Sequence, residues 1–202
     1  MQRFANQLSK RTMKIYTKTG DKGTSQLYSG ERRSKDDRVF MALGDTDELN
    51  AMLGVVREHW RPLANEAEIN VASQIENIQS RLFDVGSAIA TPRSSASEIK
   101  KNRTLFPDIS VPQVEEWIDE MDATLPPLQN FILPSGGLCS THFHVARAIC
   151  RRAERRVVSL IADEEVEPSV GIYLNRLSDY FFVCARYTAK LSEHPETIWT
   201  KQ

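Results

Sequence analysis

The chain has 202 residues, a length typical of one domain and sufficient to bury a core without disulfides or a structural metal. Hydrophobic residues make up 41% and charged residues 26%, and the formal net charge of −1 favours neither nucleic acid nor an anionic membrane. The three cysteines are scattered without a CxxC pair, which argues against a disulfide framework or zinc site and favours a reducing compartment. No apolar run reaches the roughly 18 residues of a membrane span, so we expect a soluble intracellular protein.

Residues 1–12 form an N-terminal tail that contains basic but no acidic side chains. Such a tail is consistent with the remnant of an organelle transit peptide, and equally with an ordinary chain terminus. We expect a single domain over residues 13–192 and a C-terminal tail over residues 193–202. Strand signals are weak, because residues 13–17 and 25–28 are short and isolated.

The loop that follows the tail has a composition that suits an anion. Residues 17–25 read Thr-Lys-Thr-Gly-Asp-Lys-Gly-Thr-Ser. Glycines let backbone N–H groups turn towards a phosphate, and Lys18 and Lys22 add positive charge. The Walker A pattern GxxxxGK[ST] does not occur, and a Gly-Asp-Lys-Gly sequence is also typical of a plain turn. On its own, Lys35 is more typical of a solvated surface than of a ligand site.

Five segments carry the apolar periodicity of helices, over residues 38–60, 65–90, 111–124, 140–161 and 168–192. The second is the clearest, because apolar residues recur at steps of four and three: Val71, Ile75, Ile78, Leu82, Val85 and Ile89. This spacing is typical of helices packed nearly parallel to their neighbours. The sequence therefore predicts an all-α fold, a five-helix bundle with ferritin-like up-and-down packing, in which residues 91–107 form a mobile loop.

Both structural and functional interpretations are possible for residues 131–137 and for the start of the fourth helix. The run from Phe131 to Gly137 is either a buried connector or an apolar wall for a large flat ligand. His142 and His144 are two apart on a helix, so they diverge and cannot both face one metal. Nothing in the sequence brings a base to a nucleophile, so an enzymatic nucleophile would belong to the substrate.

Arginines gather on one flank of the fourth helix. Its apolar stripe should face the core and consists of Phe143, Ala146, Cys150, Ala153 and Val157. Arg147, Arg151 and Arg155 are four apart along one side of this stripe, and a single Glu154 cannot neutralise them. Such a row suits a polyanion, because arginine offers forked donors to phosphate oxygens. The alternative is a solvated basic face that forms salt bridges with neighbouring helices.

The order of five motifs closely resembles the PduO-type ATP:cob(I)alamin adenosyltransferases, over about residues 14–190. The motifs are Tyr-Thr-Lys-Thr-Gly-Asp-Lys-Gly, Thr-Asp-Glu-Leu-Asn, Phe-Ile-Leu-Pro-Ser-Gly-Gly, Arg-Arg-Ala-Glu-Arg-Arg and Leu-Asn-Arg-Leu-Ser-Asp-Tyr. Two further stretches, Gly-Glu-Arg-Arg-Ser-Lys-Asp-Asp and Thr-Pro-Arg-Ser-Ser, resemble the animal mitochondrial members. The resemblance therefore favours the transit-peptide interpretation and a mitochondrial matrix location, or the cytoplasm if the source is bacterial.

The resemblance implies a homotrimer in which ATP lies between the N-terminal loop of one subunit and the arginine helix of the next. Positions that match the family's nucleotide contacts on the loop side are Thr17, Lys18, Thr19, Gly20, Ser25 and Lys35. Those on the bundle side are Arg151, Arg152, Ala153, Glu154, Arg155 and Asn175. Asp47 and Arg147 match an acidic–basic pair that bridges subunits and, with Arg151 and Glu154, complete the implied catalytic set. Phe131 matches the aromatic residue that closes the lower face of the corrin.

The implied reaction transfers the 5′-deoxyadenosyl group of ATP to cob(I)alamin and releases triphosphate. The metal centre of the substrate is the nucleophile, and an aromatic side chain below cobalt would exclude the lower ligand and ease reduction of Co(II). Mg²⁺ would arrive with ATP, with no metal ligand assigned to a protein side chain. The implied partners are a Co(II) reductase and a cobalamin-dependent mutase that receives the product.

Two other functions are compatible with parts of the sequence. A non-catalytic escort would bind and deliver cobalamin, but it would not need Arg151, Glu154 and Asn175. A basic helix that binds nucleic acid is disfavoured by the near-zero net charge and the lack of interleaved aromatic residues. His142 and Cys139 depart from the family's usual residues near the expected cobalamin side, so details of the corrin contacts stay open.

Overall fold

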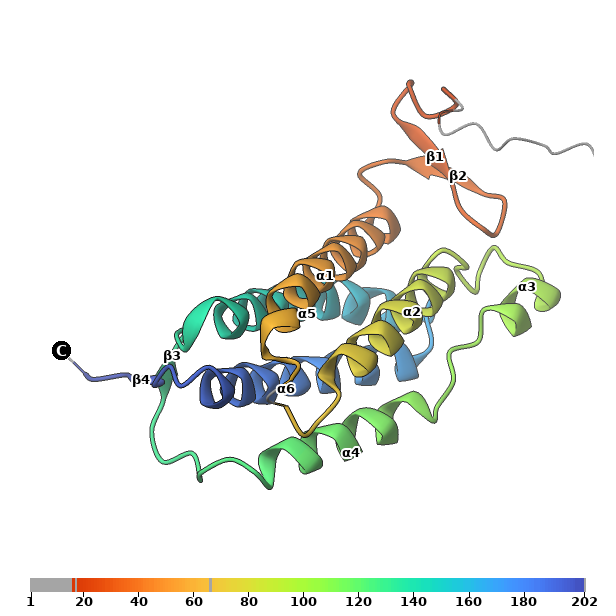
Figure 1. The fold of residues 1–202 in the computed structure, drawn as a ribbon. Helices are drawn as coiled ribbons and strands as arrows, with labels where there is room; N and C mark the ends of the chain where they lie inside the picture. Colours follow the sequence, from red (N-terminus) through yellow and green to blue (C-terminus); the bar gives the residue numbers. More distant parts are fainter. Residues whose placement is uncertain (1–15, 17, 66, 202) are drawn as a thin grey trace, which may run out of the picture.

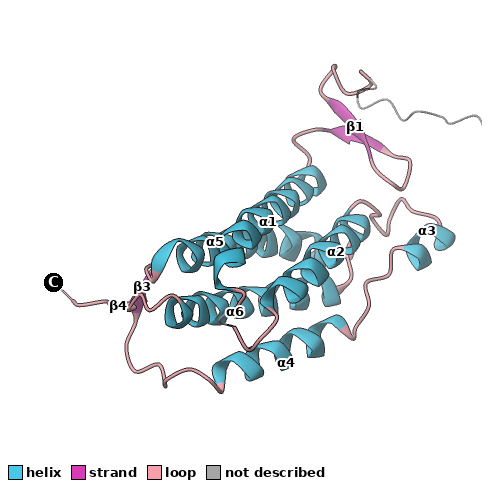
Figure 2. Cartoon of the chain, viewed as in Figure 1, coloured by secondary structure: helices cyan, strands magenta, loops and turns pink. Residues whose placement is uncertain are grey.

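The protein is described here by a computed structural model, which covers residue 16, residues 18–65 and residues 67–201. The expected tail over residues 1–12 lies outside this part. Figures 1 and 2 show a bundle of helices with a two-stranded ribbon near each end. In chain order the elements are β1 (Thr24–Gln26), β2 (Arg32–Ser34), α1 (Arg38–Trp60), the 3₁₀ helix η1 (Arg61–Leu63), α2 (Val71–Ile89), α3 (Glu98–Arg103), α4 (Ser110–Asp122), β3 (Ile132–Leu133), α5 (Gly137–Ala162), α6 (Pro168–Leu191) and β4 (Thr197–Ile198).

The expected all-α bundle is confirmed, and its five predicted helices correspond to α1, α2, α4, α5 and α6. The described residues hold one further α-helix, α3, inside the stretch predicted as a mobile loop. Sequence periodicity missed α3 because none of its six residues is buried. The loop prediction is also wrong in a second respect: Phe106 is buried against Tyr173, with ring centroids 4.9 Å apart, so this stretch is anchored to the core.

The core lies between α5 and α6, which pack against each other along their lengths (Figure 1). α1 packs on α5 and on α2, and α4 covers α6. The predicted apolar stripes of α2 and α5 are both buried as expected. Buried polar contacts also cross this core: the Tyr180 hydroxyl donates to Gln74 Oε1 at 2.9 Å, and the Cys150 thiol of α5 donates to the Leu174 carbonyl of α6 at 3.1 Å. The core therefore fixes the rotation of α5 about its axis and with it the direction of its arginines.

Two small antiparallel ribbons flank the bundle. β1 pairs with β2, with Ser25 opposite Arg33, and the pair leads directly into α1. The start of α1 is fixed by Asp37, whose carboxylate accepts from the Val39 backbone N–H at 2.8 Å. β3 pairs with β4 across the other end, with Ile132 opposite Ile198.

Helix α5 begins at Gly137, earlier than the sequence predicted, because the preceding backbone turns through left-handed conformations. Gly136 has φ +93° and Gly137 has φ +87°. A Cβ on Gly136 would lie 2.5 Å from the Ala189 Cβ and 2.9 Å from Ser140 Oγ. A Cβ on Gly137 would meet nothing closer than 3.5 Å. Gly136 is therefore the point at which α5 approaches α6 too closely for any side chain.

We expect Gly136→Ala to lower the free energy of unfolding more than Gly137→Ala. Both changes strain the backbone, at a cost of about 1–3 kcal/mol, but only Gly136→Ala also overlaps α6, which adds about 1–3 kcal/mol. Denaturant unfolding of both variants at one protein concentration measures the difference. Equal losses in the two variants would contradict the close approach of α5 to α6.

Candidate functional site

The arginine row lies along the exposed flank of α5. Arg151 and Arg155 are exposed, and neither forms a hydrogen bond or ion pair within the described residues. Glu154 lies between them and accepts a hydrogen bond from Asn175 Nδ2 on α6 at 2.8 Å. Ala153, one residue before Glu154, is buried in the core and holds this turn of the helix in place. Two free guanidiniums thus stand beside a carboxylate whose direction is set by an amide.

Arg152, next to the row, differs from Arg151 and Arg155 because it forms ion pairs. Its Nε lies 3.2 Å from Asp45 Oδ1, and its guanidinium also contacts Glu48; both acids belong to α1. Arg156 reaches the same Asp45 at 3.6 Å. The hydrogen bond to Glu48 raises the pKa of Arg152. The structure therefore places Arg152 in an ion-pair cluster with α1 and does not bring it together with Arg151 and Arg155.

Arg147 lies at the buried end of the row, next to His144. Its guanidinium sits 6.0 Å from the ring centroid of Phe182, and its Nε is buried without a hydrogen-bond partner in the described residues. His144 packs edge-on against the same ring, and its Nδ1 is likewise buried and unpartnered there. Burial, with a smaller contribution from Arg147, lowers the pKa of His144 to about 4, so this imidazole is neutral at pH 7. Buried polar atoms normally have partners, so these two nitrogens are exceptions among the described residues.

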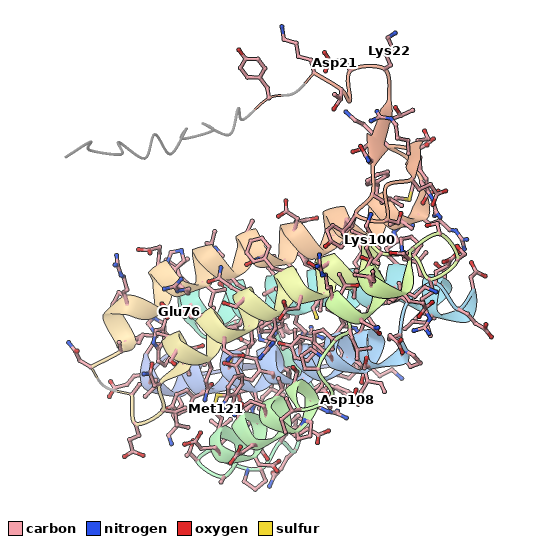
Figure 3. The ribbon with its side chains drawn as sticks, turned by 90° about the vertical axis from the view of Figure 1, so that its right-hand side faces the viewer. Asp21, Lys22, Glu76, Lys100, Asp108 and Met121 are labelled. Carbon is pink, nitrogen blue, oxygen red and sulfur yellow. The ribbon has the colours of Figure 1, made fainter. Side chains whose placement is uncertain are left out.

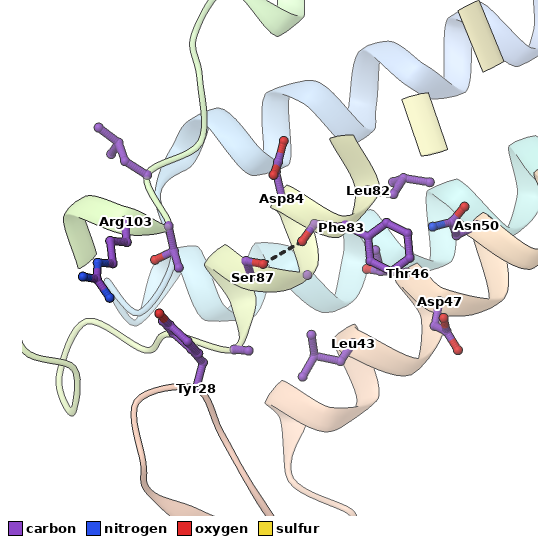
Figure 4. Close-up of a pocket in the computed structure, with 14 residues that line it drawn as sticks. Tyr28, Leu43, Thr46, Asp47, Asn50, Leu82, Phe83, Asp84, Ser87 and Arg103 are labelled. Atoms are coloured by element: carbon purple, nitrogen blue, oxygen red, sulfur yellow. Dashed lines mark hydrogen bonds between the residues drawn. The ribbon is translucent and has the colours of Figure 1, made fainter. Parts of the chain in front are cut away.

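Asp47, the other half of the expected pair with Arg147, is on the exposed side of α1. It makes no ion pair or hydrogen bond within the described residues, so it does not meet Arg147 inside one chain. Asp47 lines a cavity of about 570 Å³ between α1 and α2, together with Tyr28, Asn50 and Phe83 (Figure 4). Of the residues expected to form the site, this cavity holds Asp47 alone. The arginine row faces open surface instead.

The N-terminal loop is folded tightly, although Thr17 lies outside the described residues. The Gly23 N–H donates to the Gly20 carbonyl at 3.2 Å, and the Lys35 N–H donates to the Gly23 carbonyl at 2.9 Å. A Cβ on Gly20 would lie 3.2 Å from Lys35 Nζ, so the missing side chain makes room for the lysine. Arg32 ties the two ends of the loop, donating to the Thr19 carbonyl at 2.8 Å. The loop is therefore closed by its own backbone hydrogen bonds, with the Lys35 amine held beside Gly20.

Lys18 and Ser25 border this loop. Lys18 is exposed, in a left-handed backbone conformation (φ +58°), and Ser25 is half-buried in β1. Figure 3 shows Asp21 and Lys22 at the outer end of the loop, away from the helices. Within the chain, no hydrogen bond or ion pair joins Gly20, Ser25 or Lys35 to the arginine row in the described residues. The two halves of the expected nucleotide site are thus separate in one subunit.

A contact that sequence reasoning missed holds the β1–β2 ribbon on the bundle. Lys100 of α3 donates to the Ser29 carbonyl at 3.0 Å and lies 5.5 Å from the ring centroid of Tyr28. The Tyr28 N–H also donates to the Ala90 carbonyl at 3.0 Å. Figure 3 places Lys100 where the ribbon meets the helices. Sequence reasoning had no signal for this contact, because the lysine sits in a polar stretch without periodicity.

The remaining expected residues lie at the other end of the bundle. Phe131 immediately precedes β3, and 79% of its surface is exposed. Cys139 is buried, which raises the pKa of its thiol to about 12 and leaves it protonated at neutral pH. His142 Nδ1 donates to the Leu138 carbonyl at 2.7 Å, and its ring stacks on His59 at a centroid distance of 4.4 Å. Of the two departures from the family pattern, Cys139 is thus part of the core, and His142 is held by contacts with Leu138 and His59.

The composition of the described residues bears on metals and membranes. They contain no group of three or more His, Cys, Asp or Glu side chains placed to hold a metal ion. Among the same residues, no helix combines the length and apolar character needed to cross a bilayer.

Comparisons with known proteins agree on one family. The family model for cobalamin adenosyltransferases matches residues 15–188. The chain is 51% identical over 188 residues to the corrinoid adenosyltransferase MMAB of Mus musculus, covering 93% of this chain and 78% of the relative. It is 50% identical over 191 residues to MMAB of Homo sapiens, covering 95% and 75%. The corrinoid adenosyltransferase of Bacillus subtilis is 42% identical over 177 residues, with 86% of each chain covered.

Solved structures give the same result. A variant of the Lactobacillus reuteri PduO-type ATP:corrinoid adenosyltransferase complexed with ATP superposes with a TM-score of 0.81 at 35% identity, covering 92% of this chain and all of that one (100%). A second variant of the same enzyme, complexed with cobalamin and ATP, superposes with a TM-score of 0.79, covering 93% and 100%. The chain belongs to the cobalamin adenosyltransferase family and is an ATP:corrinoid adenosyltransferase.

Proposed function

We propose that the protein transfers the 5′-deoxyadenosyl group of ATP to cob(I)alamin and releases triphosphate. The observation that carries this proposal is the pair of unengaged guanidiniums, Arg151 and Arg155, beside the Glu154–Asn175 hydrogen bond. A leaving triphosphate carries about four negative charges, and preorganised cations stabilise such charge most where it develops. Glu154, oriented by Asn175, limits the repulsion between the two arginines before ATP binds.

The electron balance explains why no side-chain base is required. Co(I) supplies both electrons of the new bond to C5′ and becomes formally Co(III). The C5′–O bond breaks, and triphosphate departs with that electron pair. No proton moves, so the protein acts by placing C5′ over cobalt and stabilising the leaving group.

Mg²⁺ fits this site as a companion of the nucleotide. Glu154 is the one carboxylate between Arg151 and Arg155, so the donor set offers a single anionic ligand at most, and the ion would rest mainly on phosphate oxygens. When bound, it supplies positive charge that adds to that of the arginines as triphosphate leaves.

We also propose a homotrimer, in which each nucleotide site lies between two subunits. The buried, unpartnered Nε of Arg147 and the unpaired Asp47 support this arrangement, because a neighbouring copy can supply each with the other. The loop of one copy, with Thr17, Lys18, Thr19, Gly20, Ser25 and Lys35, would then close over the arginine row of the next. In that assembly Arg152 and Ala153 would contribute to the nucleotide site from their positions on α5. Arg152 would first have to release Asp45 and Glu48 of α1 and bind phosphate instead.

The wider setting follows from the similarity to the animal enzymes. We place the protein in the mitochondrial matrix as a single domain over residues 13–192, with the cytoplasm as the location for a bacterial source. A Co(II) reductase would supply the Co(I) state, and a cobalamin-dependent mutase would receive adenosylcobalamin directly. Phe131, exposed at the end of the bundle, is the residue we assign to the lower face of the corrin.

An anaerobic absorbance assay tests the proposed reaction. Chemically reduced cobalamin and Mg-ATP are mixed with the protein, and the Co(I) band is expected to give way to adenosylcobalamin while triphosphate is released. A protein that perturbs the cobalamin spectrum without converting it would be an escort. No spectral change at all would contradict both functions.

Arg151→Ala is expected to lower the rate of transfer on the order of 100-fold or more while the fold and assembly persist. The exposed side chain has no partner among the described residues to lose, so its removal should not destabilise the helix. Arg61→Ala is the matched control, because Arg61 is an exposed arginine whose ion pair with Glu58 lies within a single turn. Turnover of Arg151→Ala close to that of the control would remove Arg151 from the mechanism.

Asp47→Asn is expected to weaken both assembly and activity, with transfer falling at least about tenfold in dilute protein, because it leaves the half-buried Arg147 without the counter-charge proposed for it. Sedimentation over a dilution series and the transfer rate measure the two effects. Glu58→Gln, an exposed change on the same helix, is the control. If Arg147→Gln adds its full effect on top of Asp47→Asn, the two residues do not form a pair.

A further inference from the structure

The β1–β2 ribbon connects the loop that we assign to ATP, residues 18–24, to the bundle. This loop leads into β1 and Lys35 follows β2, so both lie at the open end of the ribbon. The turn of residues 27–31 closes the opposite end. Figure 3 shows Asp21 away from the helices and Lys100 where the ribbon meets them. The direction of the ribbon therefore decides where the loop stands.

Few contacts fix that direction. Within residues 18–38, Leu27 of the turn is buried, whereas no residue of either strand is. The backbone N–H groups of Tyr28 and Ser29 both donate to the Ala90 carbonyl at the end of α2, at 3.0 and 3.4 Å. Three residues join β2 to α1, and a short link of this kind can act as a hinge. The contacts of the turn therefore hold the ribbon at its angle to the helices.

Lys100 of α3 brings a positive charge to this turn. Its Nζ donates to the Ser29 carbonyl at 3.0 Å and lies 5.5 Å from the ring centroid of Tyr28. A Cβ on Gly30 would lie 3.8 Å from the same nitrogen. The ammonium thus contacts two consecutive residues of the turn and lies beside the third. A hydrogen bond from a charged donor is stronger than one between neutral groups, so this contact weighs heavily among the few that hold the turn.

The helix that carries Lys100 is itself fixed to the bundle, although none of its own residues is buried. Before α3, Arg93 forms an ion pair with Glu167, and Ser94 Oγ donates to Glu165 Oε1 at 2.6 Å. After α3, Phe106 is buried in the core. Both ends of the segment are therefore anchored, and α3 can serve as a fixed support for the turn.

We propose that Lys100 is a positioning residue for ATP, holding the turn of the ribbon on α3 so that the loop at the other end stands where the triphosphate binds. The proposal rests on the proposed function, in which this loop closes over the nucleotide. A ribbon held at its turn presents the loop in one place before ATP arrives, whereas a released ribbon samples other angles. The apparent affinity for ATP then falls in proportion to the fraction of chains that have the loop in place.

The consequence falls on ATP binding and not on the chemical step. Bound ATP holds the loop itself, so saturating ATP restores the held arrangement even without the lysine. Loss of Lys100 should therefore raise the KM for ATP and leave kcat unchanged. Loss of Arg151, which we assign to the leaving group, should instead lower kcat.

Lys100→Met tests the proposal, because it removes the charge and keeps an aliphatic side chain. We expect the KM for ATP in the Co(I) assay to rise about threefold to tenfold, as the loss of one hydrogen bond and one cation–π contact implies. The dissociation constant for Mg-ATP, measured by titration calorimetry without cobalamin, should rise by the same factor. The kcat at saturating ATP should stay within about twofold of the unchanged protein. Lys100→Arg keeps a charged donor and should restore most of the affinity.

Lys101→Met is the matched control. Lys101 is the next residue of α3, and its ammonium donates to Glu98 of the same helix at 2.8 Å, so its loss should leave ATP affinity unchanged. Hydrogen exchange gives a readout that does not depend on turnover. Without ATP, the amides of Tyr28 and Ser29 should exchange about threefold faster or more in Lys100→Met, and saturating Mg-ATP should restore their protection.

The proposal is overturned if Lys100→Met binds Mg-ATP as tightly as the unchanged protein, or if Lys101→Met weakens binding equally. A fall in kcat with unaltered ATP affinity would also overturn it. If the unchanged protein binds Mg-ATP but converts no Co(I), the proposed function fails, and calorimetry still decides the role of Lys100. If the unchanged protein binds no Mg-ATP, both fail together.

Discussion

The site depends on the fixed rotation of α5 between α1 and α6. Its apolar stripe is fully enclosed, and Cys150, at the centre of that stripe, donates its thiol hydrogen to the Leu174 carbonyl of α6 at 3.1 Å. A helix held on this face has no freedom to turn, so residues on its flank project in set directions. Arg151 and Arg155 therefore remain unpaired because the core, and not their own contacts, determines where they point.

The same constraint divides the charges of α5 into two groups with different tasks. One residue beyond Arg151 along the chain is a rotation of about 100°, enough to turn Arg152 towards Asp45 and Glu48 on α1. That side contributes to the packing of α5 on α1, while the other side is left with an excess of positive charge. Adjacent arginines in one motif thus differ in role: Arg152 forms a structural contact, and Arg151 is left free for the anion site that we propose.

How much of the structure the sequence predicts depends on how far apart along the chain the interacting residues are. Periodicity located α1, α2 and the stripe of α5, because these patterns repeat within a few residues. The Glu154–Asn175 bond joins positions 21 apart, and its two residues were both expected at the site. The β3–β4 pairing, the anchoring of Tyr28 by Lys100 and the stacking of His59 on His142 were not predicted, because each joins distant segments without a local pattern. The subunit-bridging role proposed for Asp47 comes from family resemblance alone.

The three thiols are all enclosed in the bundle, and this has a chemical consequence for a protein that handles a reduced cobalt centre. Thiolates are strong ligands for soft metals and react readily with oxidants. Cys150 and Cys184 are fully buried, and burial raises the pKa of both thiols, as it does that of Cys139. The folded chain thus keeps its three thiols out of contact with solvent, and alkylating reagents added to it would report unfolding and not loss of a reactive group.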